Sequence, residues 1–344
     1  MGQRANLIIV EGNKYELYYD HWCANCLDSY LFWGFDQSVK FFRAHDKQDD
    51  TLWLDNIWCE GGAVIDIDNK VLLWFGGEEI SYDIPLRRML IEFMQKNWQG
   101  FDILWANEGV ADLADYVGYD RNRVIAPFDE NELFDDTKIL NILNPANSKN
   151  YWNCAVSIRN ENGQIEIYTY DLSFDLDGFL YYGSRMLDLR LNGSFLTEYL
   201  DNTNNENTLL SGIHIDLCNK EVHIWSCFEE IFDFRRLQKA WDGYKICYHK
   251  DKFEIQTELT GRKVLFSEQS RKDLKDKIKH IVCIDTIDPL GTINSLVNRL
   301  AEQGYDVNVT PAAYMASEFI SEKSLLEELF DKQYMDEGPP SSSK

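Results

Sequence analysis

The sequence predicts an α+β protein that contains two similar modules of antiparallel β-hairpins, each with a packed helix. Three observations lead to this fold class: an internal duplication, paired hairpin signals and an amphipathic segment followed by a strand. The modules are expected at residues 1–143 and 151–275. A C-terminal β-α-β and helix segment is expected at 276–334, and a disordered tail at 335–344.

The duplication is clearest in two segments that lie 150 residues apart. Residues 62–70 are GAVIDIDNK and residues 212–220 are GIHIDLCNK, so five of the nine positions are identical. Unrelated segments would share roughly one residue in such a window. Further matches follow in the same order in both halves, including LFWG with LYYG and WQGFDI with WDGYKI. Two copies of one module explain this conserved order.

Each module is expected to begin with two hairpins. Residues 5–20 combine β-branched and aromatic residues on either side of Gly12-Asn13, which is typical of two strands joined by a tight turn. Asn162-Gly163 takes the same place in the second copy. A second hairpin is predicted within residues 62–76, with its turn at residues 68–70.

A helix and a strand complete the module. Pro85 stands at the start of a segment in which Leu86, Met89, Leu90 and Phe93 recur at helical spacing, which predicts a helix over 85–98. Gly100 ends it, and FDILWA is a strand. In the second copy the Arg-Arg to Trp distance shrinks from eleven to six residues, so that helix is either shorter or begins earlier, as at Cys227.

The pattern changes after about residue 275. HIVCID (280–285) is predicted as a buried strand, residues 289–303 as an amphipathic helix and YDVNVT (305–310) as a second strand. A last helix is expected at about 321–334. NPANSKN (144–150) has turn composition and joins the copies, and residues 202–207 form a polar loop.

Charge and composition exclude several classes of protein. The chain has 344 residues and a net charge of -24, which argues against binding nucleic acid or an anionic membrane. It has no apolar run long enough to span a bilayer, and its first residues do not resemble a signal peptide. Most of the eight cysteines sit in apolar, strand-like runs and are expected to be free thiols. A reducing, cytoplasmic location is therefore expected.

Two N-terminal segments carry a family resemblance. QRANLIIVEG with YELYYDHW, and the block from WCEGGAVIDID to the helix and WANEGVADLADYVG, resemble a widespread group of uncharacterised bacterial proteins. The likeness covers residues 3–22 and 53–118 and implies a bacterial protein, but no activity. In that group the position of Cys23 is often Gly, which implies that Cys23 is not a required ligand.

The residues that could support chemistry do not form a complete motif. His21, Cys23 and Cys26 could hold zinc only if a fourth ligand such as Cys59 joined them through the fold, so structural thiols are expected and no metal or cofactor is predicted. The sequence has neither a phosphate-binding loop nor a G-x-S-x-G elbow. His214 and His223 correspond to Val64 and Leu73 in the first copy, which favours a packing role in the sheet.

The leading functional hypothesis is an acidic protein that binds or neutralises a basic protein partner, such as an immunity protein that blocks a bacterial toxin. Negative charge would speed the encounter, and exposed aromatic residues would slow dissociation. The alternative for the acidic residues is an ordinary solvated surface. The candidate partner-binding residues are Asp49, Asp50, Trp53, Trp58, Asp129, Glu130, Asp135 and Asp136.

Two other hypotheses remain open. The chain could be an enzyme with its site in a cleft between the modules, where His21, Glu60 and Trp105 differ between the copies and are the first candidates. It could also mimic nucleic acid, which would require regular rows of carboxylates on one face. A non-enzymatic role is favoured because no catalytic signature is present.

Overall fold

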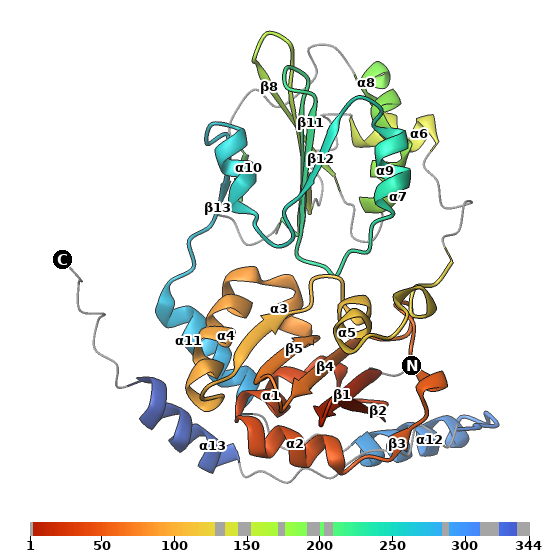
Figure 1. The fold of residues 1–344 in the computed structure, drawn as a ribbon, viewed down its shortest axis with the longest axis vertical. Coiled ribbons are helices and arrows are strands. Elements are labelled where there is room, and N and C mark those ends of the chain that lie inside the picture. Colours follow the sequence, from red (N-terminus) through yellow and green to blue (C-terminus); the bar gives the residue numbers. More distant parts are fainter. Residues whose placement is uncertain are drawn as a thin grey trace. The chain divides into compact units, whose positions relative to one another are not determined.

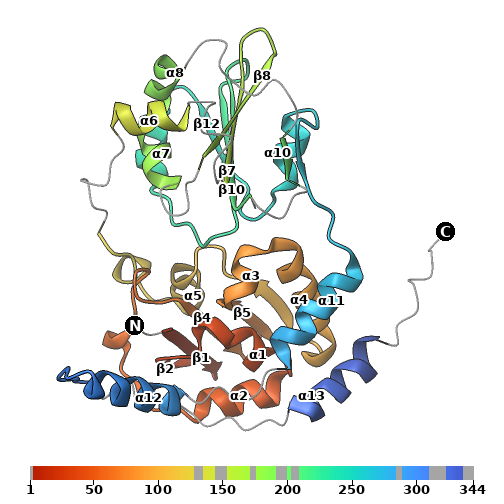
Figure 2. The ribbon, with the colours of Figure 1, turned by 180° about the vertical axis from the view of Figure 1, so that it is seen from behind.

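The computed structural model describes residues 3–127, 135–143, 153–170, 176–190, 200–202, 209–283, 289–309 and 323–335. The chain is α+β, with two mixed sheets (Figures 1 and 2). It divides into two compact units: unit 1 comprises residues 1–126 and 269–344, and unit 2 comprises residues 127–268. Among the described residues, no helix is both long and apolar enough to cross a membrane.

Unit 1 is built on a six-stranded sheet with the strand order β3-β2-β1-β4-β5-β6. Its strands are β1 (Ala5–Glu11), β2 (Lys14–Asp20), β3 (Lys47–Gln48), β4 (Gly61–Asp66), β5 (Val71–Phe75) and β6 (Asp102–Trp105). Its α-helices are α1 (Leu27–Phe32), α2 (Phe35–Arg43), α3 (Glu78–Tyr82), α4 (Ile84–Asn97), α5 (Val110–Val117), α11 (Arg271–Val282), α12 (Pro289–Glu302) and α13 (Lys323–Phe330). Short helices are η1 (Ala24–Cys26), η2 (Asp50–Leu52), η3 (Arg121–Arg123) and the π-helical η8 (Asp331–Met335).

Unit 2 is built on a five-stranded sheet with the strand order β12-β11-β10-β7-β8. Its strands are β7 (Cys154–Arg159), β8 (Ile165–Tyr170), β10 (Ser211–Asp216), β11 (Glu221–Ser226) and β12 (Lys245–Tyr248), and β9 (Leu200–Asn202) pairs separately with β13 (Val264–Phe266). Its helices are α6 (Asp136–Ile142), α7 (Leu176–Tyr182), η6 (Gly183–Arg185), α8 (Met186–Leu189), α9 (Phe234–Ala240) and α10 (Glu254–Leu259). Figure 1 shows α6 to α9 on one side of this sheet and α10 with β13 on the other.

The two sheets repeat one topology. Each sheet contains two antiparallel hairpins, β1–β2 with β4–β5 in unit 1 and β7–β8 with β10–β11 in unit 2. The first strands of the two hairpins pair in parallel, as β1 with β4 and β7 with β10. A last strand, β6 or β12, pairs in parallel with the second strand of the second hairpin. The registers agree: Gly62 lies opposite Asn6 in β1, and Gly212 lies opposite Ala155 in β7. The hairpins predicted from the sequence are confirmed, whereas the parallel pairings between them were not foreseen.

Equivalent side chains tie the helices of each copy together. The indole of Trp98 donates to the carbonyl oxygen of Leu31 at 2.7 Å, and the indole of Trp241 donates to that of Leu180 at 2.9 Å. In both hairpin turns an asparagine amide bonds the aspartate three residues earlier at 2.8 Å, Asn69 to Asp66 and Asn219 to Asp216. These contacts match the repeated LFWG/LYYG and Trp blocks, so the sequence repeats correspond to repeated structure.

The helix predicted over 85–98 is α4, and its N-cap is Asp83, whose side chain accepts the backbone N–H of Leu86 at 3.0 Å. The counterpart in copy two is α9, seven residues long against fourteen in α4. Its N-cap is Asp233 rather than a residue near Cys227. The helix in copy two is therefore shorter, as one of the two sequence interpretations required.

The C-terminal prediction needs a correction. Residues 280–282, expected in a strand, end the twelve-residue helix α11, and residues 305–309 belong to neither helix nor strand. Ser270 caps α11, and Leu274, Ile278, Ile281 and Val282 form its buried stripe. The apolar run HIVCI is thus the end of a helical stripe, which a short window cannot distinguish from a strand. Helices α12 and α13 lie where they were expected, and residues 284–288, 310–322 and 336–344 lie outside the described part.

The sheet of unit 1 separates two apolar layers. One layer packs α1, α2, α4, α11, α13 and η8, with Phe32, Trp98, Phe330 and Tyr334 fully buried. The other layer packs α5 and Trp53 against the opposite face of the sheet. Ser29 in α1 and Trp33, the C-cap of α1, donate side-chain hydrogen bonds to backbone carbonyl oxygens of α11. The chain that follows unit 2 therefore completes the core of unit 1.

Candidate functional site

The 49–60 segment contains half of the residues predicted to bind a partner. Asp49 is exposed and caps η2 by accepting the backbone N–H of Thr51 at 2.9 Å, and Asp50 is exposed beside it. Trp53 is 9% exposed and stacks on Tyr119 with a ring separation of 5.0 Å. The acids therefore face solvent, while Trp53 belongs to the apolar layer beneath them.

Two large apolar side chains project from this segment. Ile57 is 63% exposed and Trp58 is 53% exposed. The Asp55 carboxylate accepts the backbone N–H groups of both residues, at 3.0 and 3.2 Å, and Asn56 donates its backbone N–H to Val124 at 2.9 Å. These bonds hold residues 55–59 in a fixed turn, here called the Trp58 turn. Its exposed side chains are presented on ordered backbone rather than on an untethered loop.

Charged groups surround the Trp58 turn. The guanidinium of Arg4 lies 4.7 Å from the centre of the Trp58 ring, and Glu60 accepts the backbone N–H of Arg4 at 2.9 Å. Residues 46–60 contain five acidic side chains and one basic one, Lys47. The turn therefore combines a braced aromatic anchor, with Arg4 against its ring, with a mostly acidic sequence around it.

The other four predicted acidic residues lie in the chain of unit 2. Asp129 and Glu130 lie outside the described residues. Asp135 and Asp136 belong to unit 2, where Asp135 caps α6 and Asp136 accepts a hydrogen bond from the hydroxyl of Tyr182. Both therefore have local bonding roles in unit 2.

The three residues suggested for an enzyme site have separate surroundings. His21 is buried beside Trp22, with its Nδ1 atom 2.5 Å from the hydroxyl of Tyr19. Glu60 is exposed, and Trp105 packs edge-on against Trp74 at 5.1 Å. His21 and Glu60 both lie next to the start of β1, whereas Trp105 ends the edge strand β6.

The cysteines near His21 are buried free thiols. Burial raises the pKa of Cys26 and holds the pKa of Cys23 well above its usual value, and burial also raises the pKa of Cys59 to about 12. A thiol of this kind is a poor nucleophile because the thiolate is the reactive form. Among the described residues, no group of three His, Cys, Asp or Glu side chains has an arrangement that could hold a metal ion.

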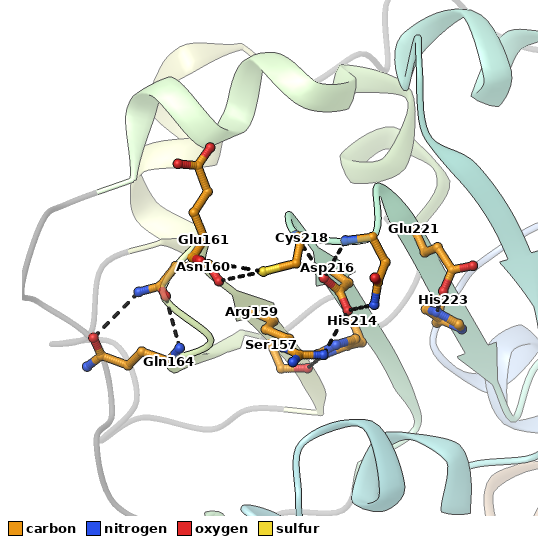
Figure 3. A network of polar contacts seen from close by, with 11 residues as sticks. Ser157, Arg159, Asn160, Glu161, Gln164, His214, Asp216, Cys218, Glu221 and His223 are labelled. Atoms are coloured by element: carbon orange, nitrogen blue, oxygen red, sulfur yellow. Dashed lines mark hydrogen bonds and ion pairs between the residues drawn. The ribbon is translucent and has the colours of Figure 1, made fainter.

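Copy two contains a polar layer that the sequence interpretation did not find. Ser157 Oγ lies 2.9 Å from His214 Nδ1, as Figure 3 shows. His223 Nδ1 lies 2.9 Å from His249 Nε2. His223 Nε2 lies 3.2 Å from Glu221 Oε2. The three histidines therefore lie on one face of the unit 2 sheet: His214 and His223 pair across one hairpin, and His249 follows 26 residues after His223.

The matching positions in copy one are all apolar. The strand registers pair Ile8 with Ser157, Val64 with His214 and Leu73 with His223, and all three copy-one residues belong to the layer under α5. The sequence repeats also pair His214 and His223 with aliphatic residues. They miss Ser157 and His249 because the equivalence of these two residues depends on strand register, which the short repeat blocks do not supply.

The chain was compared with protein-family models, curated proteins and solved structures, and nothing matched in any of the three.

Proposed function

We propose that this protein binds a basic protein partner through the Trp58 turn and the acidic residues around it, and that it acts in the cytoplasm as a neutralising protein of the immunity type. The observation that carries the proposal is the exposure of Ile57 and Trp58 on hydrogen-bonded backbone. None of the eight cysteines, all of them within the described residues, forms a disulfide, which supports a reducing location.

The braced turn favours tight binding. Aromatic residues dominate binding hot spots, and a residue held in place before binding loses little conformational entropy on docking. Asp55 and Asn56 supply this bracing through the bonds to the Trp58 turn and to Val124. Trp58 and Ile57 are therefore the anchors that would enter apolar pockets of the partner.

Charge selects the partner. Asp49, Asp50 and Glu60 are exposed and lie within nine residues of these anchors in the sequence, and the whole chain carries a charge of -24. Such a field accelerates association with a cationic surface and opposes association with an acidic one. The partner is therefore a protein whose contact surface has an apolar pocket rimmed by Lys and Arg.

Trp58→Ala is expected to weaken binding of the partner by about 30-fold, because truncating a hot-spot aromatic costs about 2 kcal/mol. The full chain is used to capture proteins from its native cells, and the captured protein is identified, purified and tested by surface plasmon resonance. Phe234→Ala is the matched control, since Phe234 is 45% exposed on α9 in unit 2. A basic protein retained by the wild type and this control but lost by Trp58→Ala supports the proposal.

The kinetics separate the two parts of the surface. Asp50→Asn with Glu60→Gln is expected to slow association, whereas Trp58→Ala is expected to speed dissociation. Affinity for the partner should also fall with added salt. An acidic partner, or a captured protein that binds all variants equally, would refute the proposal.

A further inference from the structure

The polar layer of copy two replaces a complete apolar layer of copy one. Two further pairs of equivalent residues extend the set described above. Ala106 corresponds to His249, because their backbone N–H groups bond the equivalent residues Trp74 and Ile224. Leu113 corresponds to Gln256. Leu113 and Gln256 each pack over the equivalent glycine, Gly62 or Gly212. The residues Ser157, His214, His223, His249 and Gln256 are here called the histidine layer.

Gln256 connects the histidine layer to the helix that covers it. Its Nε2 atom donates to the carbonyl oxygen of Ala155 at 2.8 Å and lies 3.2 Å from Ser157 Oγ. Its Oε1 atom accepts the indole N–H of Trp225 at 2.8 Å. Since Gln256 lies on α10, the seating of α10 on the sheet depends on these polar contacts as well as on apolar packing.

Adding protons to the imidazoles of the histidine layer would break hydrogen bonds or leave a buried charge without a partner. His223 and His249 stack with a ring separation of 5.1 Å, and their facing nitrogen atoms can share only one proton. His214 is 2% exposed, and its Nε2 atom has no hydrogen-bond partner among the described residues. A second positive charge on the stacked pair, or a positive charge on His214, would therefore have no opposite charge or hydrogen-bond acceptor to stabilise it.

The charged groups around the histidine layer do not supply that compensation. The cations that act on it are Arg159 from β7, Lys245 from β12 and Lys252 before α10. The acids are Asp216 and Glu221. Asp216 already accepts hydrogen bonds from Asn219 and Cys218 and pairs with Arg159. Glu221 pairs with both Lys245 and His223, so it can balance one charge on the stacked pair but not a second one.

We propose that the histidine layer is an acid-sensitive latch, in which protonation of the imidazoles releases α10 and the adjoining β13 from the sheet of unit 2. Release exposes the imidazoles to water, which solvates the added charge. Copy one has no such device at this face, because its equivalent layer is aliphatic and packs under α5. The proposal is independent of partner binding through the Trp58 turn.

The direction of the response follows from linkage. Burial, and then repulsion from His223, lowers the pKa of His214 to about 4. Burial, and then His223, also lowers the pKa of His249. The open state therefore binds more protons than the closed state below the ordinary histidine pKa, so opening becomes easier as the pH falls.

Hydrogen exchange of the full chain, read by mass spectrometry and corrected for intrinsic rates, tests the latch. Between pH 7.5 and 5.0, residues 254–266 are expected to exchange about 30-fold faster, as proton linkage to His214 alone requires. The internal control is α5, the structural counterpart of α10, whose exchange should not become faster at pH 5.0. Protection of 254–266 that is insensitive to pH, or that falls in parallel with α5, would overturn the proposal.

A variant with the copy-one residues gives a second test. The triple variant His214→Val, His223→Leu, His249→Ala is expected to keep α10 protected from exchange at both pH values. If α10 lost as much protection at pH 5.0 as in the wild type, that result would count against the latch.

If the variant does not fold, an NMR titration of the histidines in the wild type tests the latch instead. His214 should gain its proton together with the loss of α10 protection, and titration without that loss would refute the latch. Global melting is unsuitable because burial raises the pKa of Glu230 in the same unit to about 7, which acts in the opposite direction.

Discussion

Gly34→Ala is expected to destabilise unit 1 by about 4 kcal/mol. Gly34 has φ +101°, which side chains rarely adopt, and a Cβ atom at this position would lie 2.6 Å from the carbonyl oxygen of Asn97. The turn between α1 and α2 must pass this close to the end of α4. Both backbone strain and a steric clash therefore contribute to the loss.

Gly12→Ala is the matched control for this substitution. Gly12 also has a positive φ, +61°, but a Cβ atom there would meet nothing within 4 Å, so a loss of only about 1 kcal/mol is expected. Chemical denaturation followed by hydrogen exchange of β4 amides measures the free energy of unfolding of unit 1. Equal losses for the two variants would show that the approach to Asn97 is not important. Gly183 has the same contact with Ala240 in copy two.

Asp28→Asn is expected to stabilise unit 1 by about 4 kcal/mol at pH 8 and by only about 1.5 kcal/mol at pH 5. Asp28 is 2% exposed, and burial raises the pKa of its carboxyl to about 7. The folded protein thus keeps a proton that the unfolded chain has lost above about pH 4. Stability is consequently lost as the pH rises from about 4 through 7, and an amide at this position avoids that loss.

A second buried group contributes with the same sign. His45 Nε2 lies 2.6 Å from Asp20 Oδ2, and although burial opposes it, this contact raises the pKa of His45. The stability it supplies is present below the ordinary histidine pKa and is lost as the pH rises through its folded value. In the wild type, the free energy of unfolding of unit 1 should therefore be higher at pH 5 than at pH 8, by at least about 3 kcal/mol.

The measurement is the free energy of unfolding of unit 1 at pH 5 and pH 8, for the wild type and Asp28→Asn. Asp36→Asn is the control, because Asp36 is an exposed residue of the first turn of α2. The wild-type difference between the two pH values should shrink in Asp28→Asn and persist in the control. An unchanged pH dependence in Asp28→Asn would show that the Asp28 carboxyl is not the group responsible.

Local signals in the sequence were sufficient for most of the fold. Gly12-Asn13 and Asn162-Gly163 marked hairpins, and the spacing of Leu86, Met89 and Phe93 marked α4, because turns and amphipathic helices depend on neighbouring residues. The parallel pairing of β1 with β4 was not predictable in this way, since it joins segments about 55 residues apart. The end of α11 was mistaken for a strand because its last apolar residues are contiguous.

The functional surfaces were predictable only in part. Trp53 and Trp58 lie in the same segment and look alike in the sequence, yet Tyr119 covers Trp53 and leaves Trp58 exposed. Exposure depends on a residue more than 60 positions away, which composition cannot show. The histidine layer was hidden for a similar reason: its members come from separate strands, a loop and a helix, and only the strand register aligns them with copy one.

Unit 2 is inserted within the chain of unit 1, and this order has a consequence for synthesis on the ribosome. Helix α11, which packs on α1 and α4, is translated only after the whole of unit 2. Domains generally fold as units while the chain emerges, so the nascent residues 1–126 must wait with an apolar helix-binding face uncovered until about 150 further residues have been added. Truncated or stalled products that end within unit 2 should consequently be bound by chaperones through that face.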